Sequence, residues 1–395
     1  MVLSWQFSSP PLAFFRDNNG FALNRQRAWV EIDLTAIAHN VREIKGCLGP
    51  STELMAVIKA DAYGHGALSV ARTALAAGAT WLAVATLSEG MALREGGIVA
   101  PTLLLSAINT PEEIAFCDRW ELQPTLSNAQ QALIFSETMV RLGGTLAVHL
   151  KLDTGMSRLG TPWHEALPFA QLVQQLPGLE IASVYSHLAA ADDPDLRITQ
   201  GQHQRFEAAI AQLRQAGIVP PYLHLANSAA TLRDKRLHYD LVRVGLGIYG
   251  LYPAAYLQGA VSLRPVMQVK ARVTQVKTIP PGTGVSYGHQ FICDREMDLA
   301  VVGIGYADGV PRNLSNRLEV LVRGQRLRQV GAITMDQLML DVSPIPDLQV
   351  GEVVTLLGRD GAEVITADDW AAALGTISWE ILCGFKNRLP RTPIS

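Results

Sequence analysis

The sequence predicts an α/β fold, a (β/α)8 barrel followed by a C-terminal, mostly β domain. About eight short apolar runs alternate with helix-like segments over residues 54–245, and the chain then becomes rich in strands and turns. Continuous apolar strands with helices between them indicate a buried parallel sheet. Eight such units in about 200 residues fit a closed barrel better than the alternative, an open doubly wound sheet.

The first elements begin at residue 29. Residues 30–32 are a short strand, and Asp33 is a good N-cap for the next helix, which Gly49 and Pro50 end. Short apolar runs of strand length then recur along the chain. These eight barrel strands are expected at residues 54–59, 81–86, 102–106, 122–126, 146–152, 181–187, 222–226 and 241–245.

The pattern changes near residues 261–265. Apolar and polar residues alternate from Met267 to Thr274, which is typical of a half-buried strand. Further strands are expected at 299–304, 318–322, 329–333, 338–342 and 352–357, and helical signals return at 367–374 and 379–385. We therefore predict a barrel domain over residues 28–264 and a β domain over 265–395. The strand at 29–33 fits either domain.

Residues 1–27 are expected to form a disordered extension. Pro10, Pro11 and the run Asn18-Asn19-Gly20 disfavour regular structure there. The apolar piece at 12–15 is too short for the core of a secretory signal, and no basic segment precedes it.

Composition excludes several classes of protein. Hydrophobic residues make up 48% of the 395 residues, which excludes disorder as the dominant state. The net charge of −3 argues against nucleic acid as a partner, and no run approaches the roughly 20 apolar residues that span a bilayer. The four cysteines are scattered, so we expect no metal site, no disulfide framework and a cytoplasmic location.

Reactive side chains of a barrel lie at the C-terminal ends of its strands. Lys59 ends the first apolar run. Its stem either follows apolar surface with the amine in solvent, or the amine is desolvated and forms a Schiff base. Other strand ends carry polar groups with structural alternatives: His187 as a core histidine, Arg243 as an ion-pair partner of Asp240, and Arg158 as a loop partner of Asp153.

The last two strand–helix loops of a barrel often bind a phosphate. Here they offer the Ser228 hydroxyl and glycine amides near Gly245. Backbone N–H groups at such a place bind dianions. An amine on the first strand, opposite a phosphate-binding site on the last two strands, suits pyridoxal phosphate.

The segment Ala56-Val57-Ile58-Lys59-Ala60-Asp61-Ala62-Tyr63-Gly64-His65-Gly66 resembles the cofactor-attachment motif of the alanine racemase family. The resemblance runs from about Trp29 to Arg391 and includes the motifs at 151–160, 186–187, 227–228, 243–245, 284–288, 303–309 and 334–337. It implies a fold-type-III enzyme that depends on pyridoxal 5'-phosphate. It also implies a homodimer whose active sites are shared between the subunits.

The resemblance also implies roles for single residues. The two catalytic bases are Lys59, which carries the cofactor, and Tyr287, which the partner subunit delivers. The implied cofactor contacts are Lys59, Tyr63, His187, Asn227, Ser228, Arg243, Gly245 and the amide of Leu246. The implied substrate contacts are Arg158, Met335, Asp336 and Tyr306, and Lys151 resembles a lysine that is often carbamylated. Trp379 stands where the family usually has a tyrosine at the phosphate, so this contact is kept, weakened or lost.

The activity that the resemblance implies is the interconversion of L-alanine and D-alanine, which supplies D-alanine for peptidoglycan. A racemase of the same fold with a wider amino-acid preference is an alternative. A decarboxylase of the same fold type lacks the context of Tyr287. A non-catalytic carrier of pyridoxal phosphate is a single barrel, so the β domain argues against it.

Overall fold

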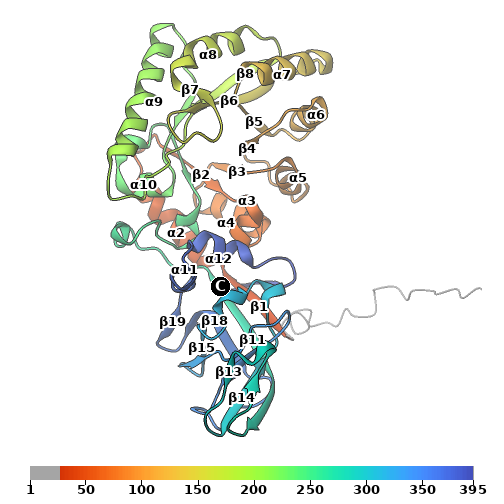
Figure 1. Cartoon of the computed structure of the whole chain (residues 1–395). Coiled ribbons are helices and arrows are strands. Elements are labelled where there is room, and N and C mark those ends of the chain that lie inside the picture. Colours follow the sequence, from red (N-terminus) through yellow and green to blue (C-terminus); the bar gives the residue numbers. More distant parts are fainter. Residues whose placement is uncertain (1–26, 395) are drawn as a thin grey trace, which may run out of the picture. The chain divides into compact units, whose positions relative to one another are not determined.

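The computed structural model describes residues 27–394 (Figure 1). The expected extension over residues 1–27 lies outside the described residues, apart from Arg27. The described chain forms two compact units. Residues 32–267, 377–384 and 393–394 make up the barrel unit, and residues 27–31, 268–376 and 385–392 make up the β unit.

Eight parallel strands form the centre of the barrel unit, in the order β10-β2-β3-β4-β5-β6-β8-β9, with β10 paired to β2. Between β9 and β10 the ring is completed by the backbone hydrogen bonds Asp240 N to Leu223 O (3.1 Å) and Arg243 N to Ala226 O (3.0 Å). The predicted barrel is therefore confirmed. The strands are β2 (Glu53–Val57), β3 (Trp81–Val84), β4 (Thr102–Ala107), β5 (Gln123–Leu126), β6 (Leu146–Asp153), β8 (Leu179–Tyr185), β9 (Tyr222–His224) and β10 (Leu241–Val244), and the short β7 (Thr161–Pro162) pairs with β6.

Helices lie along the outside of these strands (Figure 1). They begin where the sequence supplies caps: Asp33 accepts a hydrogen bond from Ala36 N at 2.8 Å, and Thr86 with Glu89 forms a capping box. Their apolar faces are buried, as Ile37, Val41 and Ile44 show in the first of them. The helices are α2 (Leu34–Gly46), α4 (Ala67–Ala77), α5 (Leu87–Glu95), α6 (Pro111–Arg119), α7 (Ala129–Leu142), α8 (Ala166–Gln175), α9 (Arg197–Gln215) and α10 (Ser228–Arg233). Helix α12 (Ser378–Gly384), which also belongs to this unit, contacts the turn α3 (Lys59–Gly64) instead.

The β unit is built on a nine-stranded sheet with the path β16-β15-β18-β11-β1-β20. Off this path β14 pairs with β11, β17 with β14, and β19 with β18. The strand that fitted either domain, β1, thus lies between β11 and β20. The bounds are β1 (Ala28–Asp33), β11 (Met267–Ile279), β14 (Met297–Val302), β15 (Glu319–Val322), β16 (Gln325–Arg328), β17 (Leu338–Asp341), β18 (Val353–Asp360), β19 (Glu363–Ile365), β20 (Arg391–Ile394), the separate hairpin β12 (Gly284–Val285) and β13 (Phe291–Ile292), and helix α11 (Ala367–Leu374).

The prediction of a strand at residues 329–333 is wrong. Only an isolated bridge joins Gln329 to Leu340, and the strand in this region is the earlier β16, paired with β15. Gly331 has φ +75°, which interrupts an extended chain. The Gln329 side-chain amide also donates to the carbonyls of Val330 and Gly331. These two carbonyls therefore accept from a side chain instead of from a neighbouring strand. The apolar pattern of the sequence gives no sign of such bonds.

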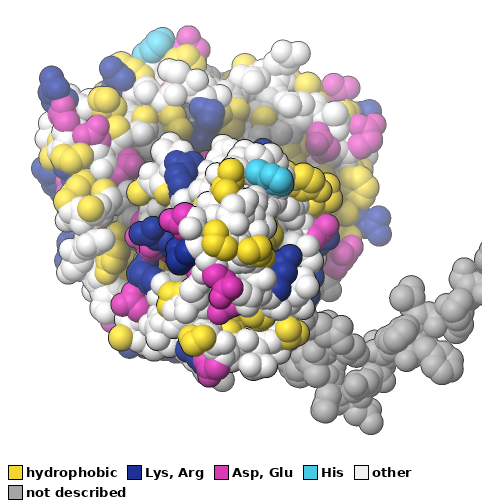
Figure 2. All heavy atoms as spheres, turned by 60° about the horizontal axis from the view of Figure 1, so that its bottom comes forward, with side chains coloured by type: hydrophobic (Ala, Val, Ile, Leu, Met, Phe, Trp, Pro, Cys, Tyr) yellow, Lys and Arg dark blue, Asp and Glu magenta, His cyan; other side chains and the backbone are white. Residues whose placement is uncertain are grey.

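Charges on the face of the molecule in Figure 2 are mixed, with acidic side chains between basic ones and hydrophobic side chains among both. Between residues 27 and 394, none of the helices combines the length and the apolar character that a membrane span requires.

Candidate active site

A cavity of about 580 Å³ lies at the C-terminal ends of the barrel strands. All the predicted cofactor contacts line it, together with the two basic residues of the 151–160 motif. The lining includes Lys59, Tyr63, Lys151, Arg158, His187, Asn227, Ser228, Arg243, Gly245, Leu246 and also Tyr185 and Trp379. Side chains from strands far apart in the sequence thus meet in one place, as a barrel predicts.

Lys59 begins the short turn α3 (Lys59–Gly64) and does not end strand β2 as expected. The four residues from Ala60 to Tyr63 all have φ between 53° and 54°. This left-handed conformation costs L-residues roughly 1–2 kcal/mol each, and such strain is concentrated at functional sites. The Glu89 carboxylate accepts from Ala60 N at 2.7 Å and Asp61 accepts from Ala67 N at 2.8 Å, so the turn is fastened at both ends.

Arg243 lies in strand β10 and is 4% exposed. It donates to Ser186 O at 2.7 Å, to His224 Nδ1 at 3.0 Å and to His187 Nδ1 at 3.1 Å. Burial lowers its pKa to about 10, so it stays charged near neutral pH. The alternative pairing with Asp240 is wrong, because that carboxylate accepts from Leu223 N at 2.8 Å.

A chain of buried hydrogen bonds extends from Arg243 across the barrel interior. A guanidinium has no acceptor, so His224 accepts at Nδ1 and carries its proton at Nε2. This proton is donated to Ser183 Oγ (2.8 Å), Ser183 donates to His149 Nδ1 (2.6 Å), and His149 Nε2 donates to Gln123 Oε1 (2.8 Å). Burial lowers the pKa of both histidines, to about 3 for His149, and keeps them neutral. The donor and the acceptor of each hydrogen bond in this chain are thereby determined.

The sequence analysis assigned no role to Gln123, His149, Ser183 or His224. A signal was present, because a polar residue inside a continuous apolar strand needs a buried partner. Tyr185 was missed as well. Its ring stacks on His224 at 4.6 Å, and its hydroxyl pairs with Thr125 Oγ1 at 2.6 Å.

Replacing Ser183 by alanine should lower the free energy of unfolding by about 1–3 kcal/mol, because His224 Nε2 and His149 Nδ1 then lose their partner in the core. Denaturant unfolding of the purified protein measures the change. The matched control is Ser136→Ala, which removes a buried hydroxyl with a single bond to Pro177 O. An equal or smaller cost for Ser183→Ala than for Ser136→Ala would contradict the hydrogen-bond chain.

Ser228, Gly245 and Tyr63, for which the sequence predicts phosphate contacts, lie together on one side of the cavity. Ser228 Oγ accepts from Gly245 N (3.1 Å) and from Gly247 N (3.4 Å), so its own proton is free to point into the cavity. A Cβ at residue 245 would lie 2.6 Å from the Tyr63 hydroxyl, so a larger residue there would displace this tyrosine. Burial raises the pKa of Tyr63 to about 12, which keeps it a neutral donor. Asn227 caps α10 by accepting from Ala230 N at 3.1 Å.

Lys151 and Arg158 form the basic side of the cavity. Lys151 is 6% exposed, and its amine lies 4.4 Å from the centroid of the Tyr185 ring. Burial, with Arg243 and Arg158 nearby, lowers the pKa of this amine well below its usual range. Asp153 accepts from three successive backbone amides, those of residues 155–157, and so shapes the loop that carries Arg158. No ion pair joins Asp153 to Arg158 within residues 27–394, so that alternative is not supported.

Four predicted site residues, Tyr287, Tyr306, Met335 and Asp336, belong to the β unit and are not among the described residues that line the barrel cavity. Tyr287 is 71% exposed. It follows Ser286, which has φ +63° and donates to Ala332 O at 2.7 Å, so the exposed tyrosine stands on an anchored turn. A separate cavity of about 940 Å³ in the β unit is lined by Tyr287, Thr334 and Gln337 among others.

No group of three or more potential ligands places His, Cys, Asp or Glu around a metal ion within the described part of the chain. The barrel cavity presents an amine, basic residues, a neutral histidine and hydroxyl donors. This set suits a phosphorylated aldehyde cofactor bound to the amine of Lys59.

Both parts of the chain, the barrel domain and the β domain, match models of the same enzyme family. The model "Alanine racemase, N-terminal domain" matches residues 32–253, and "Alanine racemase, C-terminal domain" matches residues 266–393. The chain belongs to the alanine racemase family, which confirms the resemblance in its motifs.

Curated relatives and solved structures agree with this assignment. The chain is 65% identical to the alanine racemase of Nostoc sp. over 95% of this chain and 97% of that protein. It is also 65% identical to that of Synechocystis sp., over 93% and 99%. The alanine racemase structure from Streptomyces lavendulae has a TM-score of 0.88 at 38% identity, covering 94% of this chain and 97% of that one. The E. faecalis alanine racemase gives 0.89 at 33%, covering 93% and 98%.

Proposed function

We propose that the protein is an alanine racemase, an isomerase that interconverts L-alanine and D-alanine with pyridoxal 5'-phosphate. The observation that carries this proposal is the meeting of Lys59, Arg243 and the Tyr63–Ser228–Gly245 group in one barrel cavity. The 65% identity to curated alanine racemases supports the choice of substrate.

The residues of the cavity fit the cofactor. Lys59 would attach it, and Tyr63, Ser228 and the amides of Gly245 and Leu246 would hold its phosphate. Arg243, fixed by its carbonyl and histidine partners, is a donor and would bind the ring nitrogen, and His187 would contact the ring. Asn227 would contribute to the phosphate site by capping the start of α10, which carries Ser228. When bound, the cofactor withdraws electrons from the α-carbon of the amino acid and so lowers the cost of removing its proton.

Racemisation needs a proton donor and acceptor on each face of the α-carbon. Lys59 holds the proton on one face, and Tyr287 holds it on the other. Tyr287 projects from the β unit with most of its ring exposed. We therefore propose a homodimer in which the partner subunit supplies this tyrosine, together with Tyr306 on the path of the substrate and with Met335 and Asp336 at its carboxylate.

Arg158 binds the substrate carboxylate in this proposal, and Lys151 supports it. Burial lowers the pKa of the Lys151 amine and so favours its unprotonated form. In that form the nitrogen can add to carbon dioxide and release a proton, which forms a carbamate. The carbamate would accept a hydrogen bond from Arg158. Trp379, which also lines the cavity, offers an indole N–H where the family usually has a tyrosine. We also propose a cytoplasmic location and D-alanine for peptidoglycan as the use of the product.

A racemisation assay on a panel of amino acids, with the visible absorption of the holoenzyme recorded, tests the function. The expected result is cofactor absorption with formation of D-alanine from L-alanine, and much slower reaction of larger amino acids. Absorption without any D-product would contradict the proposal and indicate a carrier. Equal rates for many amino acids would indicate a broad-specificity racemase instead.

A further inference from the structure

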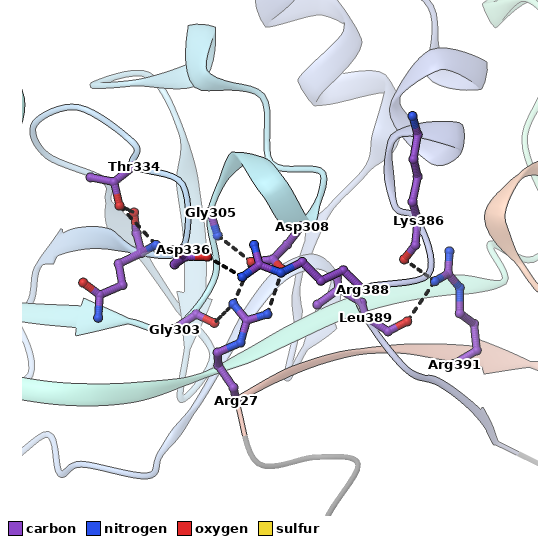
Figure 3. Close-up of polar contacts among 11 residues, drawn as sticks. Arg27, Gly303, Gly305, Asp308, Thr334, Asp336, Lys386, Arg388, Leu389 and Arg391 are labelled. Atoms are coloured by element: carbon purple, nitrogen blue, oxygen red, sulfur yellow. Dashed lines mark hydrogen bonds and ion pairs between the residues drawn. The ribbon is translucent and has the colours of Figure 1, made fainter. Parts of the chain in front are cut away.

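Two arginines and two aspartates of the β unit form a charge cluster around one buried carboxylate (Figure 3). Asp308 is at its centre, and its side chain is 0% exposed. Arg27 donates to both carboxylate oxygens at 2.7 Å and also to Gly303 O at 2.9 Å. Arg388 reaches the same carboxylate with Nε at 3.5 Å and donates through Nη2 to Asp336. Two arginines therefore balance two aspartates, and Arg388 touches both.

This cluster connects the two loops that carry Tyr306 and Met335. Asp308 accepts from Gly305 N at 2.9 Å and so closes the turn at residues 305–308. That turn is joined to the next loop by Tyr306 N to Thr334 O (3.0 Å) and Ala307 N to Met335 O (3.0 Å). The backbones are so close that a Cβ at Gly305 would lie 2.3 Å from Thr334 O. The two loops are thus packed against each other, and Asp308 holds the first of them through its bond to Gly305 N.

The turn at residues 334–337 presents backbone amides and also carries a negative side chain. Thr334 N donates to Gln337 O (2.9 Å) and Gln337 N to Thr334 Oγ1 (3.2 Å), while the amides of Met335 and Asp336 have no partner among the described residues. Successive free N–H groups favour a carboxylate, whereas an unpaired aspartate repels one. In Figure 3 the Asp336 carboxylate turns toward Arg388.

We propose that Arg388 is a positioning residue for the substrate carboxylate. It neutralises Asp336, turns that side chain aside, and connects the turn at 334–337 to the buried carboxylate of Asp308 and its partner Arg27. The turn then offers amides rather than negative charge to an amino-acid substrate. This inference rests on the proposed racemase function, because it concerns the same substrate.

The test is Arg388→Gln in the full-length holoenzyme. Arg388 is 44% exposed, so the protein is expected to fold, whereas loss of Arg27 would leave a buried charge unpaired. The KM for alanine should rise about tenfold while kcat changes less than about threefold, because binding is lost in ground state and transition state alike. Arg388→Lys, which keeps the charge without the planar fork, should give a smaller rise.

The matched control is Arg323→Gln. Arg323 is another arginine of the β unit that forms ion pairs with two acidic residues, Asp347 and Glu352. This variant should leave the KM unchanged. Hydrogen exchange without substrate gives a readout independent of activity. The amides of Tyr306, Ala307 and Thr334 should exchange faster in Arg388→Gln but not in Arg323→Gln.

An unchanged KM for Arg388→Gln, or the same rise in Arg323→Gln, would overturn the proposal, as would unchanged exchange at residues 303–309 and 332–338. Failure of the wild-type protein to form D-alanine would overturn the proposed function instead. In that case the exchange data would still decide whether Arg388 holds the turn.

Discussion

Replacing Lys59 by alanine should reduce racemisation by at least about 10⁴-fold, since one change removes both the cofactor attachment and one of the two proton carriers. The characteristic visible absorption of the holoenzyme should disappear or shift at the same time. Enantiomer-resolved assays and absorption spectra of the same preparation measure both effects. The strained turn at residues 60–63 directs this single lysine into the cavity, so no neighbouring residue is expected to substitute for it.

The matched control for this change is Lys45→Ala. Lys45 is a lysine of the same unit that donates to Gly78 O on the surface, and its loss should leave racemisation intact. Residual activity of Lys59→Ala above about one per cent of wild type would place the essential amine elsewhere. Lys151 would then be the next candidate, because its amine is also in the cavity.

Replacing Tyr287 by phenylalanine should reduce racemisation by about 10²–10⁴-fold, the usual contribution of a general acid or base. Only the hydroxyl is removed from an exposed ring, so folding and cofactor absorption should persist. Exchange of the α-proton in deuterated water distinguishes the two faces. If Lys59 serves one face and Tyr287 the other, the variant should still exchange the α-proton of one enantiomer of alanine and lose exchange for its mirror image.

The control for this change is Tyr256→Phe, which alters a tyrosine that is 44% exposed and bonded to Arg233. Its activity should remain close to wild type. Exchange of both enantiomers by Tyr287→Phe at the wild-type rate would show that a different group serves the second face.

Much of the barrel could be predicted because each strand is a short run of apolar residues and each helix is marked by its spacing and caps. The residues around Lys59 and Arg243 were found because barrels collect polar groups at strand ends. What escaped prediction depends on geometry. The left-handed turn after Lys59 has no glycine from Ala60 to Tyr63 to reveal it, and the hydrogen bonds through Ser183 and His149 depend on the registers of separate strands.

Charge pairing over long sequence distances was equally hidden. Arg27, Asp308 and Arg388 come from three distant parts of the chain, and only folding of the sheet brings them together. The family resemblance predicted Tyr306 and Asp336 as site residues, but it did not indicate which residues hold their loops. The alternative pairings of Arg243 with Asp240 and of Arg158 with Asp153 failed for a related reason. Each aspartate satisfies backbone amides of its own loop or strand.

In the proposed homodimer, Lys59 of one subunit works with Tyr287 of its partner. A heterodimer with Lys59→Ala in one subunit and Tyr287→Phe in the other, purified through two different tags, tests it most directly. If the site is shared, one of its two sites is intact, and the heterodimer should have about half of the wild-type activity. A heterodimer of a wild-type subunit and a Lys59→Ala/Tyr287→Phe double variant should then be nearly inactive. The reverse pattern, activity only in the second heterodimer, would contradict the shared site.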